Sequence, residues 1–271
     1  MNSILDDSLY CRNEEHYLEI RNEARKFNLL FNGMNIVQDD IFSIIRNYGK
    51  REGYMIESLR YPVSDREFCA CTFVLKGTIF VFVNSYIPLS EQIFASAHEL
   101  FHIIRYIDGK DTAFSSRGSI LKASSIDETI SVKEDMEADS FAALFLVPSD
   151  FLMQQAEIYS IHKDRIKLRD VLKLMDIFAV PFKPMVFRLY EDKFMNARKA
   201  DDFLSLDSSV IEEEIQLSGI SKRWQKTTPD LMEFGSLLEQ MTINERMGYA
   251  TESRIEEDRK TVEQIRMKLQ M

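Results

Sequence analysis

The chain has 271 residues, of which 45% are hydrophobic and 29% are charged, and its formal net charge is −10. This composition is typical of a globular protein and excludes a disordered or fibrous chain, and the length allows a sizeable hydrophobic core. An acidic chain has no general attraction to nucleic-acid phosphates, which argues against a DNA-coating role.

The sequence carries no pattern typical of export, membrane insertion or disulfide bonding. The N-terminal residues lack a basic segment followed by an apolar stretch, so we expect no signal peptide. Apolar runs such as residues 78–83 are too short to span a bilayer. The three cysteines are Cys11, Cys69 and Cys71, and this odd number does not make a disulfide framework. We interpret Cys69 and Cys71 as small buried side chains and expect a cytoplasmic protein.

The first part of the chain combines helices with a group of strands. Apolar residues three and four positions apart predict helices over residues 13–30 and 37–48. Three segments rich in β-branched and aromatic residues predict strands: residues 54–61, 68–75 and 78–83. Lys76-Gly77 lies between the last two strands and predicts a hairpin, so we expect a small antiparallel sheet.

Two strong helices follow, separated by a polar segment. The first is expected to begin at Ser90 as N-cap and to end at Asp108-Gly109. Residues 109–133 are serine-rich and show no clear period, and a loop of that length in a compact domain is functional or mobile. Residues 134–147 then form the second helix.

The rest of the chain is expected to be helical. Helices are predicted near residues 150–160, 164–178 and 183–195. Thr228 as N-cap before Pro229 predicts another helix. The last is expected to begin near Ser253, whose pairing with Glu256 has the pattern of a capping box. Its narrow apolar stripe must pack against the body of the chain or against a second copy.

The sequence His98-Glu99-Leu100-Phe101-His102 is the feature that points to chemistry. Residues four apart lie on one helix face, so His98 and His102 can bind one tetrahedral metal ion. Glu99 is rotated around the helix and can contact a water on that metal. Zinc lowers the pKa of such a water, and Glu99 would move its proton to the leaving amine. The alternative is a pair of core histidines bonded to carbonyls or carboxylates.

A catalytic zinc site of this kind needs a third protein ligand, usually a carboxylate. Four acids lie at the start of the second strong helix: Glu134, Asp135, Glu137 and Asp139. Asp135 and Asp139 share one helix face, so one can bind the metal while the other holds a ligand histidine by its second ring nitrogen. We prefer Asp135 as ligand and Asp139 as its supporting acid, with Glu134 in reserve and Glu137 on the opposite side. Alternatively, the acids form a solvated helix start that suits the helix dipole.

These motifs resemble the ImmA/IrrE family of metallopeptidases. The resemblance rests on IFASAHELFH (residues 93–102), followed by MEADSFAALFLVP (residues 136–148), and extends to residues 178–190. It covers about residues 10–195, while the last 75 or so residues resemble nothing we can name.

The resemblance implies a minimal zincin-like domain that cleaves helix-turn-helix repressors at specific sites. It implies zinc ligation by His98 and His102, acid–base catalysis by Glu99, and Asp135 in the place of the family's glutamate ligand. Two residues depart from the pattern. Phe101 stands where the family commonly has glycine, and Asp135 is one methylene shorter than glutamate, which keeps Glu134 open as the third ligand.

Together these features predict an α+β fold, with a small antiparallel sheet packed on the metal-binding helix and an all-helical C-terminal region. We expect a zincin-like domain over residues 1–160, a helix-turn-helix-like subdomain over 161–200, and a C-terminal helical region over 201–271. The last region is a candidate for homo-oligomer or partner contacts.

Further expectations concern the substrate and the competing roles. The strand at residues 78–83 could offer its edge to a peptide or be a core strand, and the segment 109–133 could gate the cleft or be an idle linker. A non-catalytic regulator is the alternative to a peptidase acting on a regulatory protein. Five basic residues could contact DNA in that case: Lys167, Arg169, Lys173, Lys183 and Arg188. The acidic chain disfavours direct nucleic-acid binding, and we interpret His16 and His162 as surface residues.

Overall fold

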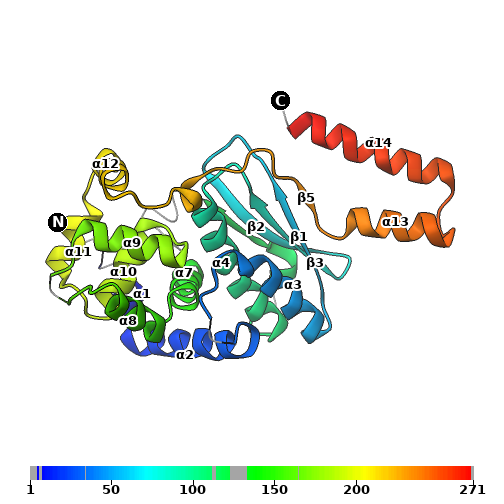
Figure 1. The fold of residues 1–271 in the computed structure, drawn as a ribbon. Helices are drawn as coiled ribbons and strands as arrows, with labels where there is room; N and C mark the ends of the chain where they lie inside the picture. The colour runs from blue at the N-terminus through cyan, green and yellow to red at the C-terminus, as the bar shows by residue number, and fades with distance from the viewer. Residues whose placement is uncertain are drawn as a thin grey trace.

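The computed structural model describes residues 5, 8–33, 35–111, 114–122, 133–163 and 165–269. Within these residues the fold is mixed and mainly helical, with one five-stranded sheet, in agreement with the predicted α+β class (Figure 1). No helix in the described part of the chain is long and apolar enough to cross a membrane.

The N-terminal helices form one wall of the core. They are α1 (Leu9–Arg12), α2 (Glu14–Phe31), the 3-10 turn η2 (Gln38–Asp40) and α3 (Ile41–Glu52). Asn13 caps α2 by accepting a hydrogen bond from the His16 amide, as expected of a polar N-cap. The periodic apolar residues of α2 are buried, which confirms the prediction for residues 13–30. The second predicted helix begins later than expected, after η2.

The sheet has the order β4-β2-β3-β1-β5. Its strands are β1 (Met55–Tyr61), β2 (Phe68–Leu75), β3 (Thr78–Asn84), β4 (Ser119–Lys122) and β5 (Glu233–Phe234). The hairpin between β2 and β3 is confirmed, and both Lys76 and Gly77 adopt positive φ in its turn. The prediction of an antiparallel sheet is wrong for one pair, because β3 inserts between β2 and β1 and runs parallel to β1.

The central position of β3 also decides which strands have free edges. Because β3 has a neighbour on both sides, it offers no edge to a peptide, so the edge-strand interpretation of residues 78–83 is wrong. The outer strands are β4 and β5, and each comes from a segment in which no strand was predicted. The region after residue 150 is therefore not all-helical, since β5 lies within it and pairs with Leu59 and Arg60 of β1.

The polar segment between the two strong helices is partly ordered. Its described residues form a short helix, α5 (Phe114–Arg117), and then β4, which pairs with β2. The prediction of a loop without regular structure is wrong for these residues. Residues 112–113 and 123–132 of the predicted loop lie outside the described part of the chain.

The two strong helices are α4 (Leu89–Ile107) and α7 (Lys133–Leu146). α4 packs against β2 and β3 on one side and against α7 on the other, and α7 packs in turn against α2. Pro88, and not Ser90, is the N-cap of α4, and Ser90 is buried inside its first turn. The predicted end at Asp108 is confirmed.

A helical region follows α7. Its elements are α8 (Ser149–Ile158), α9 (Leu168–Phe178), α10 (Phe182–Glu191), α11 (Ala197–Leu204), α12 (Ser208–Ser218) and the 3-10 turn η3 (Arg223–Gln225). A single core cluster contains buried residues from Leu5 to Trp224 and so continues across residues 160 and 200.

Arg188 fastens this region to the rest of the core. Its side chain is fully buried and donates hydrogen bonds to the Val147 carbonyl at the end of α7 and to the Tyr17 hydroxyl of α2. It also forms ion pairs with Glu191 and Asp192 at 2.6 and 2.5 Å. Arg188 is thus a structural residue and cannot contact DNA, contrary to its place among the five basic candidates.

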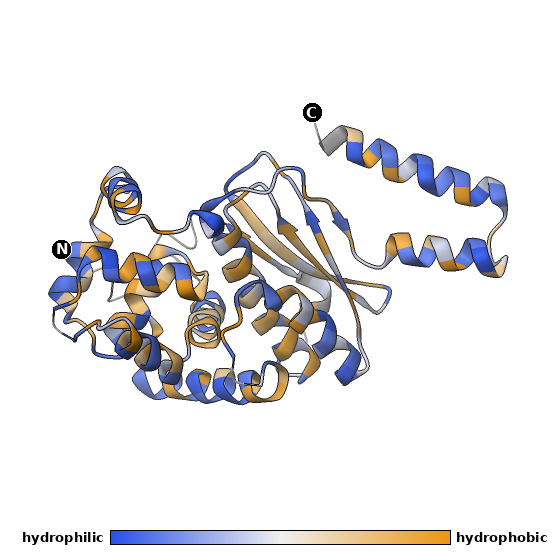
Figure 2. Ribbon diagram, in the orientation of Figure 1, coloured by the Kyte–Doolittle hydropathy of each residue, from blue (hydrophilic) through white to orange (hydrophobic). Residues whose placement is uncertain are grey.

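The C-terminal helices α13 (Leu237–Met247) and α14 (Glu252–Leu269) extend away from the body as an arm (Figure 1). Figure 2 shows that hydrophilic residues predominate on the arm. A small apolar cluster of Phe234 in β5, Met241 in α13 and Val262 in α14 joins the arm to the sheet edge, and it is much smaller than the core of the body.

Both predicted helix starts in this region are wrong. Thr228 does not cap a helix, because its amide and hydroxyl both donate to the Ser85 carbonyl. α13 begins only at Leu237, after β5. α14 begins at Glu252, where the Thr251 hydroxyl accepts from the Arg254 amide at 3.4 Å, so Thr251 replaces Ser253 as the capping residue.

Candidate metal centre

The two histidines of the motif face each other on α4. His98 and His102 are 1% and 4% exposed, and their Nε2 atoms are 3.2 Å apart. This distance is close to the separation of two ligand atoms on a tetrahedral zinc ion, about 3.3 Å for bonds of about 2.0–2.1 Å. The pair therefore has the spacing of two ligands on one ion.

Asp135 completes a cluster of three ligand residues. Its Oδ1 lies 4.0 Å from His102 Nε2, and the ligand atoms of His98, His102 and Asp135 all lie within 4.8 Å of one another. Two imidazoles and one carboxylate are a donor set that zinc prefers, with one position left for water. The residues thus fit a zinc ion in both chemistry and spacing. Glu134, the reserve candidate, does not belong to the cluster.

Asp139 orients His98 from behind. Its Oδ1 lies 2.7 Å from His98 Nδ1; since a carboxylate accepts, Nδ1 is the donor in this bond and Nε2 is the atom that faces the other histidine. Burial lowers the pKa of His98, but the hydrogen bond and charge of Asp139, with the charges of Glu99 and Asp135, outweigh it and raise the pKa. The structure therefore brings His98 and Asp139 together as the sequence predicts.

Glu99 is fully buried beside the histidines. Its Oε2 accepts a short hydrogen bond from the Ser119 hydroxyl of β4, while its Oε1 has no hydrogen-bond partner among the described residues. Burial raises the pKa of Glu99, although the charge of His98 and the nearby Ser119 and Thr72 hydroxyls lower it. The Thr72 hydroxyl lies close enough to Glu99 to lower its pKa, and its oxygen has no other partner among the described residues.

The segment carrying α5 and β4 covers the cluster. The Phe114 ring is fully buried and lies nearly parallel to the His102 ring, with centroids 6.1 Å apart. Ser119 contacts Glu99 from the same segment. The sequence did not predict Phe114 or Ser119 as site residues, because the segment has no hydrophobic periodicity. The only signal was the position of the segment in the chain, between the histidine helix and the acidic helix.

Phe101 finds room at the position where glycine is common in the resembled family. Its ring is buried on the face of α4 that meets α7, with its centroid 5.4 Å from that of Phe141. The guanidinium of Arg105 lies over the Phe101 ring at 5.0 Å. The large side chain is thus part of the α4–α7 interface and does not block the ligand cluster.

Glu137 lies on the far side of α7, as predicted, and links it to α2 and α4. It accepts hydrogen bonds from His16 Nε2 at 2.8 Å and from Arg105 at 3.1 Å. Burial lowers the pKa of His16, but its bonds with Glu19 and Glu137 outweigh burial and raise the pKa. His16 is thus a partly exposed residue that connects two helices and lies outside the cluster, and His162 is exposed as expected.

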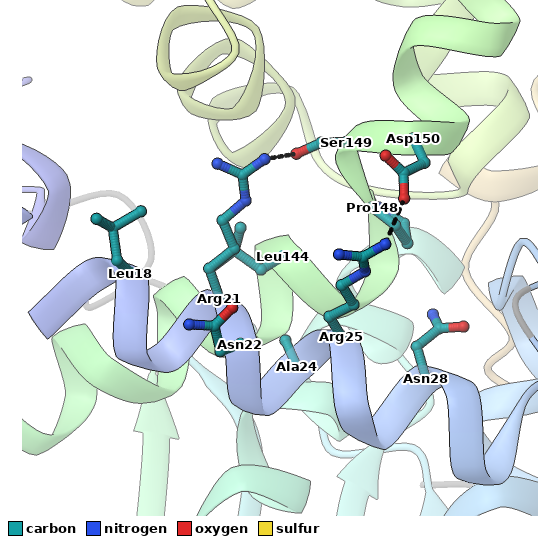
Figure 3. A pocket seen from close by; sticks show the side chains of 10 residues that line it. All are labelled: Leu18, Arg21, Asn22, Ala24, Arg25, Asn28, Leu144, Pro148, Ser149 and Asp150. Atoms are coloured by element: carbon teal, nitrogen blue, oxygen red, sulfur yellow. Dashed lines mark hydrogen bonds and ion pairs between the residues drawn. The ribbon is translucent and has the colours of Figure 1, made fainter.

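Two hollows elsewhere contain none of these residues. One, of about 210 Å³, lies between α2 and the start of α8, where Arg21 bonds Ser149 at 3.0 Å and Arg25 pairs with Asp150 at 3.5 Å (Figure 3). The other, of about 870 Å³, lies between β1 and α13.

No protein-family profile matches the chain, and no curated protein matches it. The function must therefore be inferred from the residues and their geometry.

Proposed function

We propose that the protein is a zinc-dependent endopeptidase with a minimal zincin-like catalytic domain. The observation that carries the proposal is the convergence of His98, His102 and Asp135 within 4.8 Å, with the Glu99 carboxylate buried beside them. The bond between His98 and Asp139 would also suit a core histidine, whereas Asp135, as a third ligand residue beside both rings, favours a metal site.

The ligand cluster, Glu99 and Asp139 would each have a separate role in peptide hydrolysis. Zinc held by the cluster would supply a Lewis acid that polarises the scissile carbonyl and acidifies the attacking water. Glu99 Oε1, which has no partner among the described residues, would accept the proton of the water and pass it to the leaving amine. Asp139 would keep His98 in the tautomer that binds metal.

The resemblance to the ImmA/IrrE family supports a regulatory protein as the substrate, and a helix-turn-helix repressor as the kind of protein cleaved. Such a substrate implies a cytoplasmic enzyme. The burial of Arg188 removes one of the basic residues on which direct DNA contact would depend, so a protein substrate is favoured over a nucleic-acid ligand.

The test is the zinc content per chain of purified wild type, His98→Ala, Asp135→Ala and His162→Ala. We expect about one zinc in the wild type and in His162→Ala, which removes an exposed histidine outside the cluster. The other two variants should lose the metal, since each removes one of three ligands. A wild type that stays without zinc after resupply contradicts the proposal.

One observation favours a second candidate, a non-catalytic regulator that acts by binding. Glu99 is fully buried and hydrogen-bonded to Ser119, so the described state gives a substrate no access to it. A regulator of this kind would keep its cellular function in Glu99→Gln, whereas a peptidase would lose it.

A further inference from the structure

The segment of residues 114–122 lies directly on the proposed catalytic residues. Phe114 stacks on the ring of His102, and the Ser119 hydroxyl donates to Glu99. All three residues of the motif, His98, Glu99 and His102, are nearly or fully buried. A substrate therefore reaches Glu99 only if this segment moves, although Asp135 on α7 is partly exposed.

The segment reaches the site as a strand on the outer edge of β2. Ser119 is paired with Thr72, and Leu121 with Ala70. Without β4, β2 would be an edge strand with unpaired backbone groups beside Glu99, and such an edge binds an extended polypeptide by strand addition. β4 thus occupies the place that a substrate strand would take.

Tight backbone packing holds the segment close to β2. Gly118 adopts a φ of +66°, and a Cβ at this position would lie 2.5 Å from the Thr72 carbonyl oxygen. A larger residue would have to push the segment away from β2. Glycine at this position therefore permits the close approach that covers Glu99.

Few side chains hold β4 in place. Leu121 is buried, whereas Ile120 on the opposite face is 69% exposed, and the pairing with β2 is irregular between Phe68 and Ala70. A four-residue edge strand with one buried side chain belongs to the least stable part of a fold. Such a strand can separate from β2 while the core stays folded.

We propose that residues 114–122 are an autoinhibitory segment in which β4 mimics a bound substrate strand. The ligand that displaces it is an extended polypeptide, which adds antiparallel to β2 and brings its scissile bond to Glu99. The regulatory role of the segment rests on the proposed peptidase function. The position of the segment over Glu99 and His102 is independent of that function. Cleavage then needs a substrate whose exposed segment competes with β4 for the edge of β2.

The experiment compares Leu121→Ser and Gly118→Val with the wild type, and uses Ile120→Ser as the matched control on the exposed face of the same strand. The metal-free proteins are treated with diethyl pyrocarbonate, and modification of His98 and His102 is followed by mass spectrometry. Exposed His162 serves as the internal standard. Loss of the Leu121 contact or a clash at residue 118 should speed modification about tenfold or more. Ile120→Ser should match the wild type.

A second measurement tests inhibition. Hydrolysis of fluorescein-labelled casein by the zinc-loaded proteins should rise about tenfold in Leu121→Ser and Gly118→Val, in parallel with the modification rate. Equal modification of His98 and His102 in all four proteins would overturn the proposal. Faster modification without faster hydrolysis, in proteins that cleave casein, would overturn the inhibitory role. Failure of every protein to bind zinc would refute the peptidase function and the inhibitory role, while the modification rates would still decide whether the segment covers the site.

Discussion

The two outer strands of the sheet, β4 and β5, are similar in length and burial but differ in the hydrogen bonding of the glutamate beside each of them. Each is short, comes from a distant part of the chain and has one buried apolar residue, Leu121 in β4 and Phe234 in β5. At each edge a serine also binds a glutamate: Ser119 binds Glu99, and Ser236 binds Glu57.

The difference lies in the two carboxylates. Both oxygens of Glu57 accept hydrogen bonds from Ser236, one from its amide and one from its hydroxyl. Glu99 bonds Ser119 through one oxygen only, and its other oxygen is buried without a partner among the described residues. A buried acceptor without a partner costs about 1–3 kcal/mol of stability. Glu57 therefore has the bonding of a structural residue, whereas Glu99 has an oxygen left for the proton transfer that we propose.

The largest expected effect tests this contrast directly. Glu99→Gln should lower kcat/KM for peptide hydrolysis by about 10²–10⁴-fold, because the amide cannot accept and return a proton. Zinc content should not change, since Glu99 is not a ligand in the proposed site. Glu57→Gln is the matched control at the other edge and should keep kcat/KM within about twofold. Similar losses in both variants would show that the contrast has no catalytic meaning.

A smaller effect is expected from the removal of Phe234, the buried side chain of β5. Phe234→Ala should destabilise the arm by about 3 kcal/mol, the usual cost of truncating a buried phenylalanine. Hydrogen exchange should then accelerate in α13 and α14 but not in α4, because the cluster that contains Phe234 is separate from the main core. Equal acceleration in α4 would mean that the arm and the body unfold as one unit.

The smallest effect concerns the ion pair at the β5 edge. Hydrogen bonds from Arg60 at 2.7 and 2.6 Å hold the pKa of Glu233 below its usual value of about 4.5. A lowered folded-state pKa stabilises the protein above the unfolded pKa, and this stability is lost as the pH falls through the folded value. Glu233 is partly exposed, so solvent screening limits the gain to less than about 1 kcal/mol.

This pH dependence can be measured by urea unfolding of wild type and Glu233→Gln. The wild type should be slightly more stable at pH 7, and the difference should shrink below about pH 4.5, where the Glu233 carboxylate becomes protonated. A difference that stays constant down to pH 3.5 would show that the charge of Glu233 contributes nothing.

Local sequence patterns predicted which of these side chains lie together, because the patterns act within single helices. The spacing of four residues brings His98 to His102, and it also places Asp135 and Asp139 on one face of α7. The packing of α7 against α4 then brings the acidic pair, Asp135 and Asp139, to the histidine pair.

The strands at the sheet edges were not predictable in the same way. Ser119–Lys122 and Glu233–Phe234 are too short for an alternating pattern, and their conformation comes from the partner strands β2 and β1. Thr228 and Pro229 carry a good helix-start signal, but hydrogen bonds to Ser85 and the following pairing of β5 override it. The parallel pairing of β1 with β3 likewise depends on topology and not on composition.

The buried guanidinium of Arg188 has a consequence for the order in which the chain folds during its synthesis. Tyr17 near the start of the chain and the Val147 carbonyl at the end of α7 both depend on a partner that the ribosome adds much later. Since a nascent chain emerges from its N-terminus, we expect the body to complete its core only after Asp192 has left the ribosome. The half of the protein that carries His98, His102 and Asp135 would thus be translated well before it can become fully folded.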